Sequence, residues 1–388
     1  PSAVTVAATA PQCVAAEASH SSESQVEVNT LVELTDCNLN LEASQGRSQQ
    51  ANKQRFKQAR APPPAKQQAE ACQSLNFRNP VTARYPNTDQ LWHRVGELSL
   101  FDWSVSGNET CIVVRGRGFC IALDVGACPP QAVDADHVFI SHGHVDHCGA
   151  LHMHIRKRQL LRLPPAVYYM PECLINPMQS TLAAFVTMQG DSDYAEMVSN
   201  SRLVGLKVGD RVPISNDNNQ PADAASLTLS VFATDHRVPS LGCILRRRHI
   251  VLLPECRRLR QDELRARVAQ GLPVRGPEWE PLLGYTGDTR FNVFLTPQDP
   301  DLLRVRLLIS ELTFLSGSIE RADSFGHCHV DQFAQHWRLF GAVNRLVFVH
   351  FSNKVLPEEI LERVYSTLPQ QLGRRVYCGL IAKRLLYS

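Results

Sequence analysis

One short segment combines three imidazoles and a carboxylate, Ser141-His142-Gly143-His144-Val145-Asp146-His147. It follows the apolar run Val138-Phe139-Ile140, which is typical of a buried strand, so we expect the polar string to form the loop leaving that strand. Neutral imidazole and carboxylate are ligands that a borderline cation such as Zn²⁺ prefers. Alternate residues of an extended turn point the same way. His142 and His144 can therefore share one metal ion, while Asp146 and His147 face another.

Further polar side chains stand at the ends of later apolar runs, namely His236 in Thr234-Asp235-His236, Asp288 in a glycine-flanked turn, Glu311 and His350. Added to the first segment, they supply what two metal ions need. We expect one ion to take His142, His144 and His236, the other to take Asp146, His147 and His350, and Asp288 to bridge both. Three or four protein ligands for each ion leave a position for water, which is typical of a catalytic zinc site. A surface loop with chance histidines would leave this spacing unexplained.

The elements that must position these residues are short strands and helices. Strands are predicted at Thr110–Val114, Phe119–Leu123, His137–Ile140, Leu227–Phe232, Ile250–Leu253, Leu307–Glu311 and Arg345–His350, and helices at His152–Leu163 and Val330–Leu339. Strands followed by helices, twice over, predict two sheets packed face to face with helices outside.

Composition divides the chain in two. Residues 1–75 are rich in Ala, Ser and Gln and cannot bury enough apolar surface to fold alone, so we expect a low-complexity extension that could bind a protein partner or a larger assembly. Residues 76–388 are expected to form the folded domain. The formal net charge of +2 excludes electrostatic nucleic-acid binding by the chain as a whole, so any basic surface must be local. No apolar run is long enough to span a bilayer.

The 12 cysteines are scattered without a CxxC pair, which indicates a reducing intracellular compartment and no disulfide framework. Cys148 beside His147 is expected to pack near the metal site rather than to ligate. Residues 1–45 contain six acidic residues and no Lys or Arg, unlike an organellar presequence. Cytosol, nucleus and an organelle reached by an already removed presequence all stay open.

The HxHxDH string resembles the metallo-β-lactamase superfamily, whose fold is a four-layer αββα sandwich. Further segments narrow this to a resemblance to ribonuclease Z, the endonuclease that trims tRNA 3′ ends, in its short plant and cyanobacterial form. They are Leu98–Phe101, Gly107–Cys111, Ile121–Gly126, Tyr285–Thr289, Glu311–Phe314, Gly326–His329 and His350–Ser352. The resemblance runs from about Trp92 to Leu368–Tyr377 and leaves the N-terminal extension outside.

The resemblance implies roles for single residues. His142, His144, Asp146, His147, His236, Asp288 and His350 match the metal ligands of that family. Asp124 matches a carboxylate that orients the ligand loop. Glu311 and His327 match a pair that delivers a proton to the leaving oxygen, with His329 expected to be a neighbour rather than the donor. Asp146 has a further expected part in proton transfer.

A basic, arm-like insertion is expected at residues 246–280, between His236 and Asp288, where the family carries an arm that holds tRNA. Its candidate RNA contacts are Arg257, Arg258, Arg260, Arg265 and Arg267, on a helix expected at Arg257–Arg267. The alternative is a solvated helix whose arginines pair with Glu255, Asp262 and Glu263. A second basic face is predicted at Arg156, Lys157, Arg158 and Arg162. Lys354 stands where the family usually has Arg, and loses the planar bidentate grip on phosphate.

The resemblance, together with these residues, implies a zinc-dependent endoribonuclease that removes the 3′ trailer of precursor tRNA by two-metal hydrolysis. Two zinc ions per chain are expected, although Mn²⁺ or Fe²⁺ could use the same ligands. The resemblance also implies a homodimer. Two alternatives are a ribonuclease Z-like fold recruited as a structural or moonlighting subunit of a large assembly, and another hydrolase of the superfamily.

Overall fold

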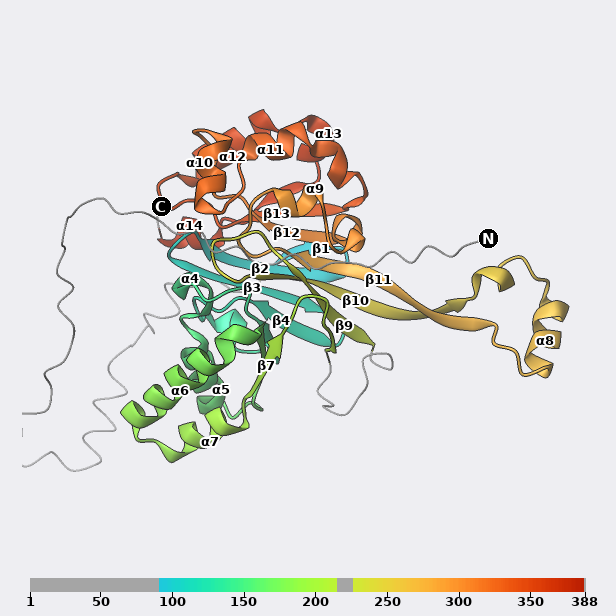
Figure 1. Cartoon of the computed structure of the whole chain (residues 1–388), viewed down its shortest axis with the longest axis horizontal. Coiled ribbons are helices and arrows are strands. Elements are labelled where there is room, and N and C mark those ends of the chain that lie inside the picture. The colour runs from blue at the N-terminus through green and yellow to red at the C-terminus, as the bar shows by residue number, and fades with distance from the viewer. Residues whose placement is uncertain (1–90, 215–225, 387–388) are drawn as a thin grey trace, which may run out of the picture. The chain divides into compact units, whose positions relative to one another are not determined.

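The computed structural model describes residues 91–214 and 226–386, and residues 1–75 lie outside this range. Two seven-stranded sheets run through the described residues (Figure 1). In the first sheet the strands lie side by side in chain order: β1 (His93–Val95), β2 (Leu98–Val105), β3 (Glu109–Gly116), β4 (Phe119–Leu123), β5 (His137–Phe139), β6 (Val167–Pro171) and β7 (Arg202–Leu206). Neighbours from β1 to β4 are antiparallel and those from β4 to β7 are parallel.

The second sheet repeats this plan. Its strands, again in chain order, are β8 (Arg211–Pro213), β9 (Leu227–Ala233), β10 (Leu241–Leu252), β11 (Arg275–Tyr285), β12 (Leu307–Glu311), β13 (Arg345–Val349) and β14 (Val376–Cys378). Pairing is antiparallel from β8 to β11 and parallel from β11 to β14. In each sheet the parallel half therefore follows an antiparallel half.

Helices connect the parallel strands, because such strands need a crossover. In the first sheet, α4 (Val145–Cys148) and α5 (Leu151–Leu160) lie between β5 and β6, and α6 (Ile175–Gln189) and α7 (Ser192–Asn200) lie between β6 and β7. The second has α9 (Asn292–Leu295), α10 (Ile319–Phe325), α11 (Val330–Gln335), α12 (Pro357–Thr367), α13 (Gln370–Gly373) and α14 (Ile381–Leu386). Short 3₁₀ turns lie at η3 (Pro130–Ala132), η4 (Glu172–Leu174), η5 (Pro254–Cys256), η6 (Pro300–Arg304) and η7 (Trp337–Ala342). No helix in the described ranges has the length and apolar character needed to cross a bilayer.

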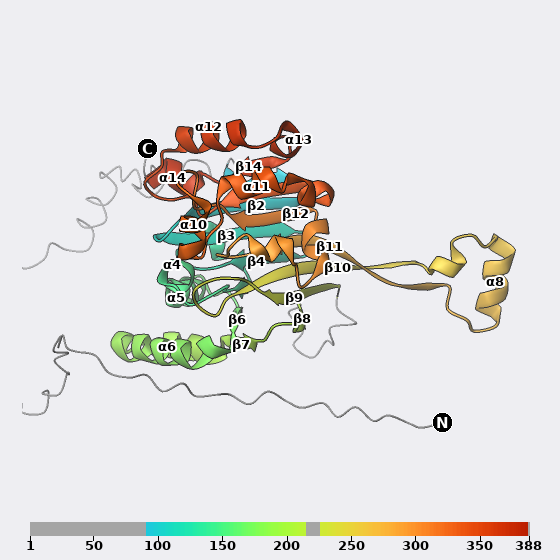
Figure 2. The same ribbon diagram turned by 45° about the horizontal axis from the view of Figure 1, so that its top comes forward.

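Alternating side chains build three apolar layers. In β12, Leu307 and Ile309 face the other sheet, whereas Leu308 faces the helices that cover its own sheet. In β2, Leu98 and Leu100 face inward, and Phe101 packs toward the outer helices. Both faces of each sheet are buried, which explains why the strands read as continuous apolar runs. Figure 2 shows α12 and α13 on one side of the sheets and α6 on the other. The predicted four-layer αββα sandwich is confirmed.

Strands β10 and β11 extend beyond their neighbours to form an arm, residues 248–279. Pairing of β10 with β9 ends at Arg247, while its pairing with β11 continues to Leu252 opposite Arg275. The helix α8 (Gln261–Ala269) lies at the far end of this two-stranded ribbon (Figure 2).

Several predicted boundaries differ from the structure. The strand expected at Ile250–Leu253 is the outer end of β10, which begins at Leu241, because pairing with β11 carries the strand through its basic residues. The basic helix begins at Gln261 rather than Arg257, since Pro254 starts a 3₁₀ turn just before it. The helix expected at Val330–Leu339 ends at Gln335 and continues as the turn η7.

Candidate metal centre

The ends of the parallel strands bring the polar segments together. The ligand loop leaves β5, Asp288 follows β11, Glu311 ends β12 and His350 follows β13. Parallel strands end at the same edge of a sheet, and the loop after β5 of the first sheet meets the corresponding edge of the second, where His147 contacts His350. His236 reaches this edge from the loop after β9.

The first group contains His142, His144 and His236. Nε2 of His142 lies 2.9 Å from Nδ1 of His144, and Nε2 of His236 lies 3.4 Å from that same Nδ1. Oδ2 of Asp288 lies 3.9 Å from Nε2 of His142. One ligand atom from each of these four residues falls within 4.8 Å of all the others.

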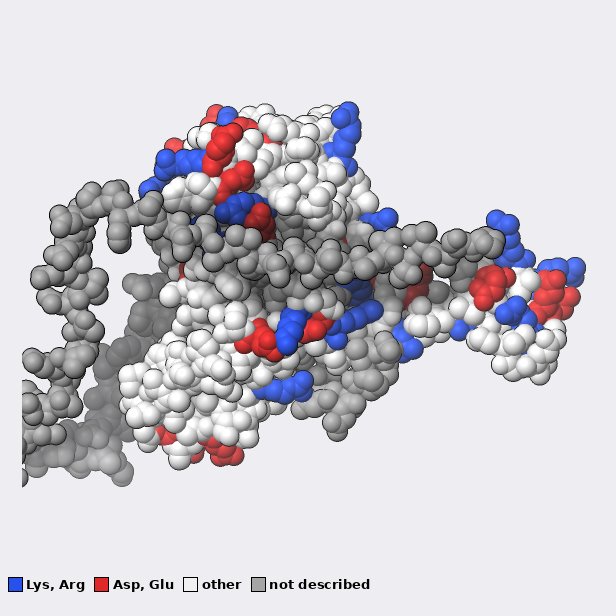
Figure 3. All heavy atoms as spheres, viewed as in Figure 1, with Lys and Arg blue, Asp and Glu red and all other residues white. Residues whose placement is uncertain are grey.

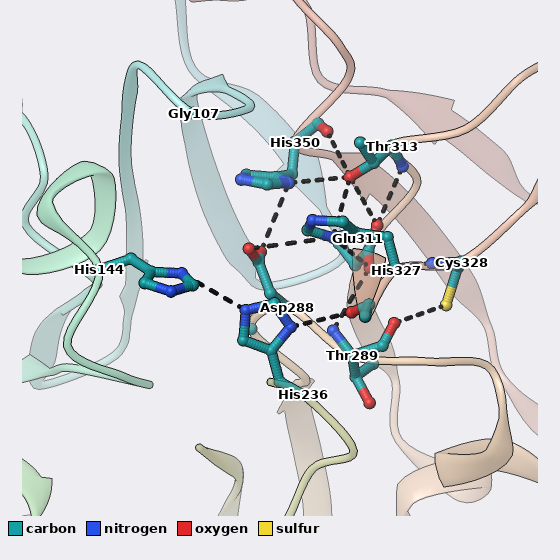
Figure 4. Close-up of polar contacts among 12 residues, drawn as sticks. Gly107, His144, His236, Asp288, Thr289, Glu311, Thr313, His327, Cys328 and His350 are labelled. Atoms are coloured by element: carbon teal, nitrogen blue, oxygen red, sulfur yellow. Dashed lines mark hydrogen bonds and ion pairs between the residues drawn. The ribbon is translucent and has the colours of Figure 1, made fainter. Parts of the chain in front are cut away.

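The second group contains Asp146, His147 and His350. The two Nε2 atoms lie 3.3 Å apart, and each lies 3.4 Å from Oδ2 of Asp146. Asp288 faces this group as well, with Oδ2 at 3.4 Å from Nε2 of His147. The structure thus brings all seven predicted ligands together, with Asp288 between the two groups; Figure 4 shows Asp288 beside His144, His236 and His350.

Hydrogen bonds on the far side of the rings decide which nitrogen carries a proton. Nδ1 of His147 donates to Oδ2 of Asp124 at 2.6 Å, and Nδ1 of His236 donates to the carbonyl of Gly326 at 2.9 Å. Ser141 Oγ donates to Asp124 and therefore accepts from Nδ1 of His142, at 3.0 Å. The Nε2 lone pairs of these rings consequently point into the site, as they do in metal-binding histidines.

Asp124 is the centre of this outer network. Besides His147 it accepts from Ser141 N at 2.6 Å, from Ser141 Oγ at 2.9 Å and from the Tyr285 hydroxyl at 2.6 Å. Its φ of 61° is in the left-handed region, which a non-glycine residue adopts only when its surroundings enforce it. His350 has the same φ of 61°. A Cβ at Gly126 would lie 1.8 Å from the carbonyl oxygen of Asp146, so the ligand loop can approach only a glycine there.

Electrostatics in the cluster favour neutral imidazoles in the first group and ionised carboxylates. Burial lowers the pKa of His142 to about 2 and also lowers the pKa values of His144 and His236. Burial opposes ionisation of Asp288, but His147 and His350 outweigh it and hold the pKa of Asp288 well below its usual range. Its Oδ1 is buried and accepts no hydrogen bond from the described residues, although Nδ1 of His350 lies 3.4 Å from it. Converging lone pairs and an unsatisfied carboxylate oxygen are compatible with metal binding.

Glu311 and His327 lie directly beside the cluster. Nδ1 of His327 is 3.0 Å from Oε1 of Glu311 and 4.0 Å from Oδ2 of Asp288 (Figure 4). Burial lowers the pKa of His327, but the Glu311 carboxylate outweighs it and raises that pKa above its ordinary value. His329 points elsewhere, because its Nδ1 accepts from Asp331 N at 3.2 Å at the start of α11.

Sequence reasoning gave no role to Thr313 and Tyr285, although both belong to the site. The Thr313 hydroxyl donates to Oε2 of Glu311 at 2.8 Å and lies 3.0 Å from Nδ1 of His350. Both lie in segments that carry the resemblance, close in sequence to Asp288 and Glu311, but nothing in those segments indicated a role for them. Cys148, as expected, lies in none of the ligand groups and packs against the apolar layer under α5.

The predicted basic residues of the arm lie around α8, away from the cluster. Arg257, Arg258, Arg260 and Arg265 are exposed, and Arg267 is half-buried. Arg260 pairs with Asp262 at 3.5 Å, as in the solvated-helix alternative, while Arg257 pairs with Glu278 at 3.6 Å rather than with Glu255. Exposed pairs of this kind are weak, so they leave the cations available to a partner. Figure 3 shows acidic and basic side chains mixed at the end of the arm.

Other predicted basic positions differ in their surroundings. The basic face expected on α5 is wrong for Arg158, which is buried against Asp136 at 2.9 Å, and Arg156 pairs with Asp191 at 2.5 Å. These charges compensate carboxylates of the protein and are not free for RNA. Lys354 is exposed in the turn after His350.

Comparison with known proteins gives relatives for most of the described chain. The tRNase Z TRZ1 of Arabidopsis thaliana is 30% identical over 276 residues, 71% of this chain and 92% of that relative. The chloroplastic tRNase Z TRZ2 of the same plant is 30% identical over 67% of this chain and 69% of its own length. A nuclear ribonuclease Z of Triticum aestivum is 32% identical over 142 residues, 37% of this chain and 71% of the relative. No family model matches the chain.

Solved structures that resemble this chain in fold include the metallo-beta-lactamase fold protein YhfI of Bacillus subtilis. Its TM-score is 0.47 at 14% identity, with 72% of this chain and 95% of that chain covered. The short form of human tRNase Z has a TM-score of 0.42 at 17% identity, covering 66% of this chain and 92% of its own.

Proposed function

The chain belongs to the tRNase Z, or ribonuclease Z, family, and from this premise we propose that it is a metal-dependent endoribonuclease that removes the 3′ trailer of precursor tRNA. The observation that carries the proposal is the convergence of seven imidazole and carboxylate side chains, Asp288 among them, next to the Glu311–His327 pair. The relatives named above support this activity and give no support to a structural subunit or to another hydrolase of the superfamily.

We propose that two zinc ions occupy the site. His142, His144 and His236 would hold one, Asp146, His147 and His350 the other, and Asp288 would hold both. Nitrogen and oxygen donors of this kind suit Zn²⁺, and Mn²⁺ and Fe²⁺ accept the same set. Two cations at such a site acidify water to give a nucleophile and neutralise charge at phosphorus.

The protein's own residues supply the remaining chemistry. Departure of the ribose 3′-oxygen requires a proton, and His327 can donate it because the Glu311 carboxylate raises the pKa of its ring and so favours the charged form. Asp146 accepts from Gly107 N at 2.9 Å, which orients its carboxylate, and besides the role of ligand we assign it a part in taking a proton from the attacking water. The products are a tRNA with a free 3′-hydroxyl and a trailer with a 5′-phosphate.

We further propose that residues 76–388 form the catalytic domain and that the arm grips the substrate. The arginines Arg257, Arg258, Arg260, Arg265 and Arg267 lie on its end, where they could contact tRNA phosphates. Lys354, close to His350 in the chain, would contact a phosphate near the cleavage site. Removal of residues 1–75 should leave turnover on free precursor tRNA unchanged, since that extension is assigned to partner binding.

A homodimer and a compartment complete the proposal. The sequence of α6 contains no charged residue and its Met188 is 69% exposed, which suits a contact with a second copy. Every cysteine in the described ranges is free, consistent with a reducing compartment. Relatives carry both chloroplastic and nuclear names, so plastid and nucleus are the compartments to test.

The deciding experiment incubates the purified protein with a 3′-extended tRNA, with and without a chelator, and identifies the product ends. We expect cleavage that the chelator stops and that added Zn²⁺ restores, with 3′-hydroxyl and 5′-phosphate ends. Absence of cleavage in the metal-loaded protein, or a cyclic phosphate on the product, would contradict the proposal.

A further inference from the structure

An exposed aromatic ring stands at the outer end of a row of rings that leads into the site. Phe325 is 43% exposed, and its ring is stacked on Phe314 with centroids 5.9 Å apart. Phe314 lies 6.2 Å from the ring of His327, which in turn lies 5.5 Å from His350. Two rings, those of Phe314 and His327, therefore lie between Phe325 and the predicted metal ligand His350.

The backbone holds Phe325 in register with the site. Helix α10 ends at Phe325, and Gly326 follows with a φ of 82°. A Cβ at Gly326 would lie 2.8 Å from Nδ1 of His236, and the carbonyl of Gly326 accepts the hydrogen bond from that ring. The turn that orients a predicted ligand thus also sets the position of Phe325.

Two cations flank the exposed ring. The guanidinium of Arg237 lies 5.8 Å from the ring centroid of Phe325, and that of Arg321 lies 5.7 Å from it. Both arginines are exposed, and neither is paired with a carboxylate in the part of the chain that the structure describes. One exposed Phe is ordinary on a protein surface. An exposed ring with two available guanidinium groups, next to the site proposed to cleave a phosphodiester, has the features of a binding site for single-stranded nucleic acid.

Resting on the proposed function, we propose that Phe325 is the stacking platform for one unpaired base, with Arg237 and Arg321 bound to the adjoining phosphates. The base belongs to the nucleotide on the 5′ side of the cleaved bond, the last nucleotide of the mature tRNA. His327 delivers its proton to the 3′-oxygen of that nucleotide, so the nucleotide lies on the His327 side of the site, where Phe325 is. Every base can stack on an aromatic face, so Phe325 can bind the last nucleotide of any tRNA, whatever its base.

The test uses the metal-loaded protein and a mature tRNA with 2-aminopurine as its last nucleotide. Stacking on Phe325 should quench the fluorescence on binding; Phe325→Ala should abolish the quenching and Phe325→Trp should keep it. The control is a precursor with an uncleavable methylphosphonate at the cleavage site and 2-aminopurine in its trailer. Its fluorescence should change by the same amount on binding to the wild type and to Phe325→Ala. Quenching that survives in Phe325→Ala, or that depends on Phe325 only in the trailer, would overturn the proposal.

Kinetics on cleavable precursor give a second reading. Phe325→Ala removes the ring on which the base stacks. The substitution should raise KM about 5- to 100-fold and leave the alkaline limb of the pH profile in place. Arg237→Ala and Arg321→Ala should raise KM and flatten its salt dependence. The matched controls are Arg338→Ala, whose guanidinium covers Trp337 at 4.9 Å, and Leu295→Ala, which is 47% exposed. If the wild type does not cleave precursor tRNA, the proposed function is refuted. If the wild type cleaves and Phe325→Ala has the same KM, only the stacking role of Phe325 is refuted.

Discussion

Oδ2 of Asp124 lies 2.6 Å from Nδ1 of His147, and both side chains are fully buried. The carboxylate also accepts from Tyr285, which is 161 positions away in the chain, so one group ties the first sheet to the second behind the predicted ligand groups. This contact selects the tautomer of His147 that presents Nε2 to the site.

Substitution of Asp124 by Asn should therefore weaken metal binding while leaving the ligands themselves in place. An amide cannot accept from Ser141, Tyr285 and His147 together, so the ring loses its fixed tautomer. We expect metal affinity to fall about 10- to 100-fold, measured by competition with a chromophoric chelator. The control is Asp134→Asn, an exposed carboxylate paired with Arg115 at 2.7 Å, which should bind metal as the wild type does.

Asp288→Ala should abolish cleavage, because this residue stands between the two ligand groups. The protein should stay folded, since Asp288 lies in the turn after β11 and belongs to none of the three apolar layers. Bound metal, counted by elemental analysis, should drop, and circular dichroism should match that of the wild type. Near-normal cleavage would contradict the assignment of Asp288 as a bridging ligand.

Glu311→Gln should change the pH dependence of catalysis as well as its rate. His327 donates while protonated, so activity falls as pH rises through its pKa. Glu311 raises that pKa against the effect of burial, and removing its charge lowers it. The alkaline limb of kcat should move to lower pH, and kcat should fall about 100-fold or more. Glu320→Gln, an exposed neighbour on α10, is the control, and an unmoved alkaline limb in Glu311→Gln would argue against proton donation by His327.

Replacing Arg257, Arg258 and Arg265 together by Gln should weaken tRNA binding without altering the cleavage step. For every phosphate that the variant no longer neutralises, the slope of log affinity against log salt should become shallower by about 1. Filter binding across salt concentrations gives the slope, and single-turnover cleavage at saturating enzyme checks the chemistry. The paired control exchanges Glu255, Asp262 and Glu263 for Gln. An unchanged slope in the arginine variant would favour the solvated-helix interpretation of α8.

The sequence predicted those parts of the site whose members are adjacent in the chain or end an apolar run. The ligand string follows β5 directly, and β4 and β12 occupy their predicted ranges. Contacts that form only on folding left no such pattern, which is why Thr313, beside His350, and Tyr285, bonded to Asp124 of the other sheet, received no role. Arg158 was misjudged for the same reason, since its burial against Asp136 depends on tertiary packing. The ligand and proton-donor roles themselves stay predictions until metal and activity are measured.

Asp102 allows a prediction about stability rather than catalysis. This carboxyl is buried in β2, where its Oδ1 accepts from Ile381 N at 3.1 Å at the start of α14 and the Tyr377 hydroxyl also donates to the carboxyl. Burial raises the pKa of Asp102 to about 7, above the value of an exposed carboxyl. Between about pH 4 and pH 7 the folded state therefore holds a proton that the unfolded state has released. The free energy of unfolding should consequently fall as pH rises through this range, by up to about 1.4 kcal/mol for each pH unit.

Asp102→Asn removes this ionisation while keeping the size of the side chain and the acceptor for Ile381. The variant should be more stable than the wild type at pH 8, and the difference should shrink as pH falls, disappearing near pH 4, where the carboxyl is protonated in both states. Urea unfolding of both proteins at pH 4, 6 and 8 measures this. A difference that stays constant with pH would show that Asp102 remains ionised in the folded protein, because only a proton taken up on folding makes the free-energy difference depend on pH in this direction.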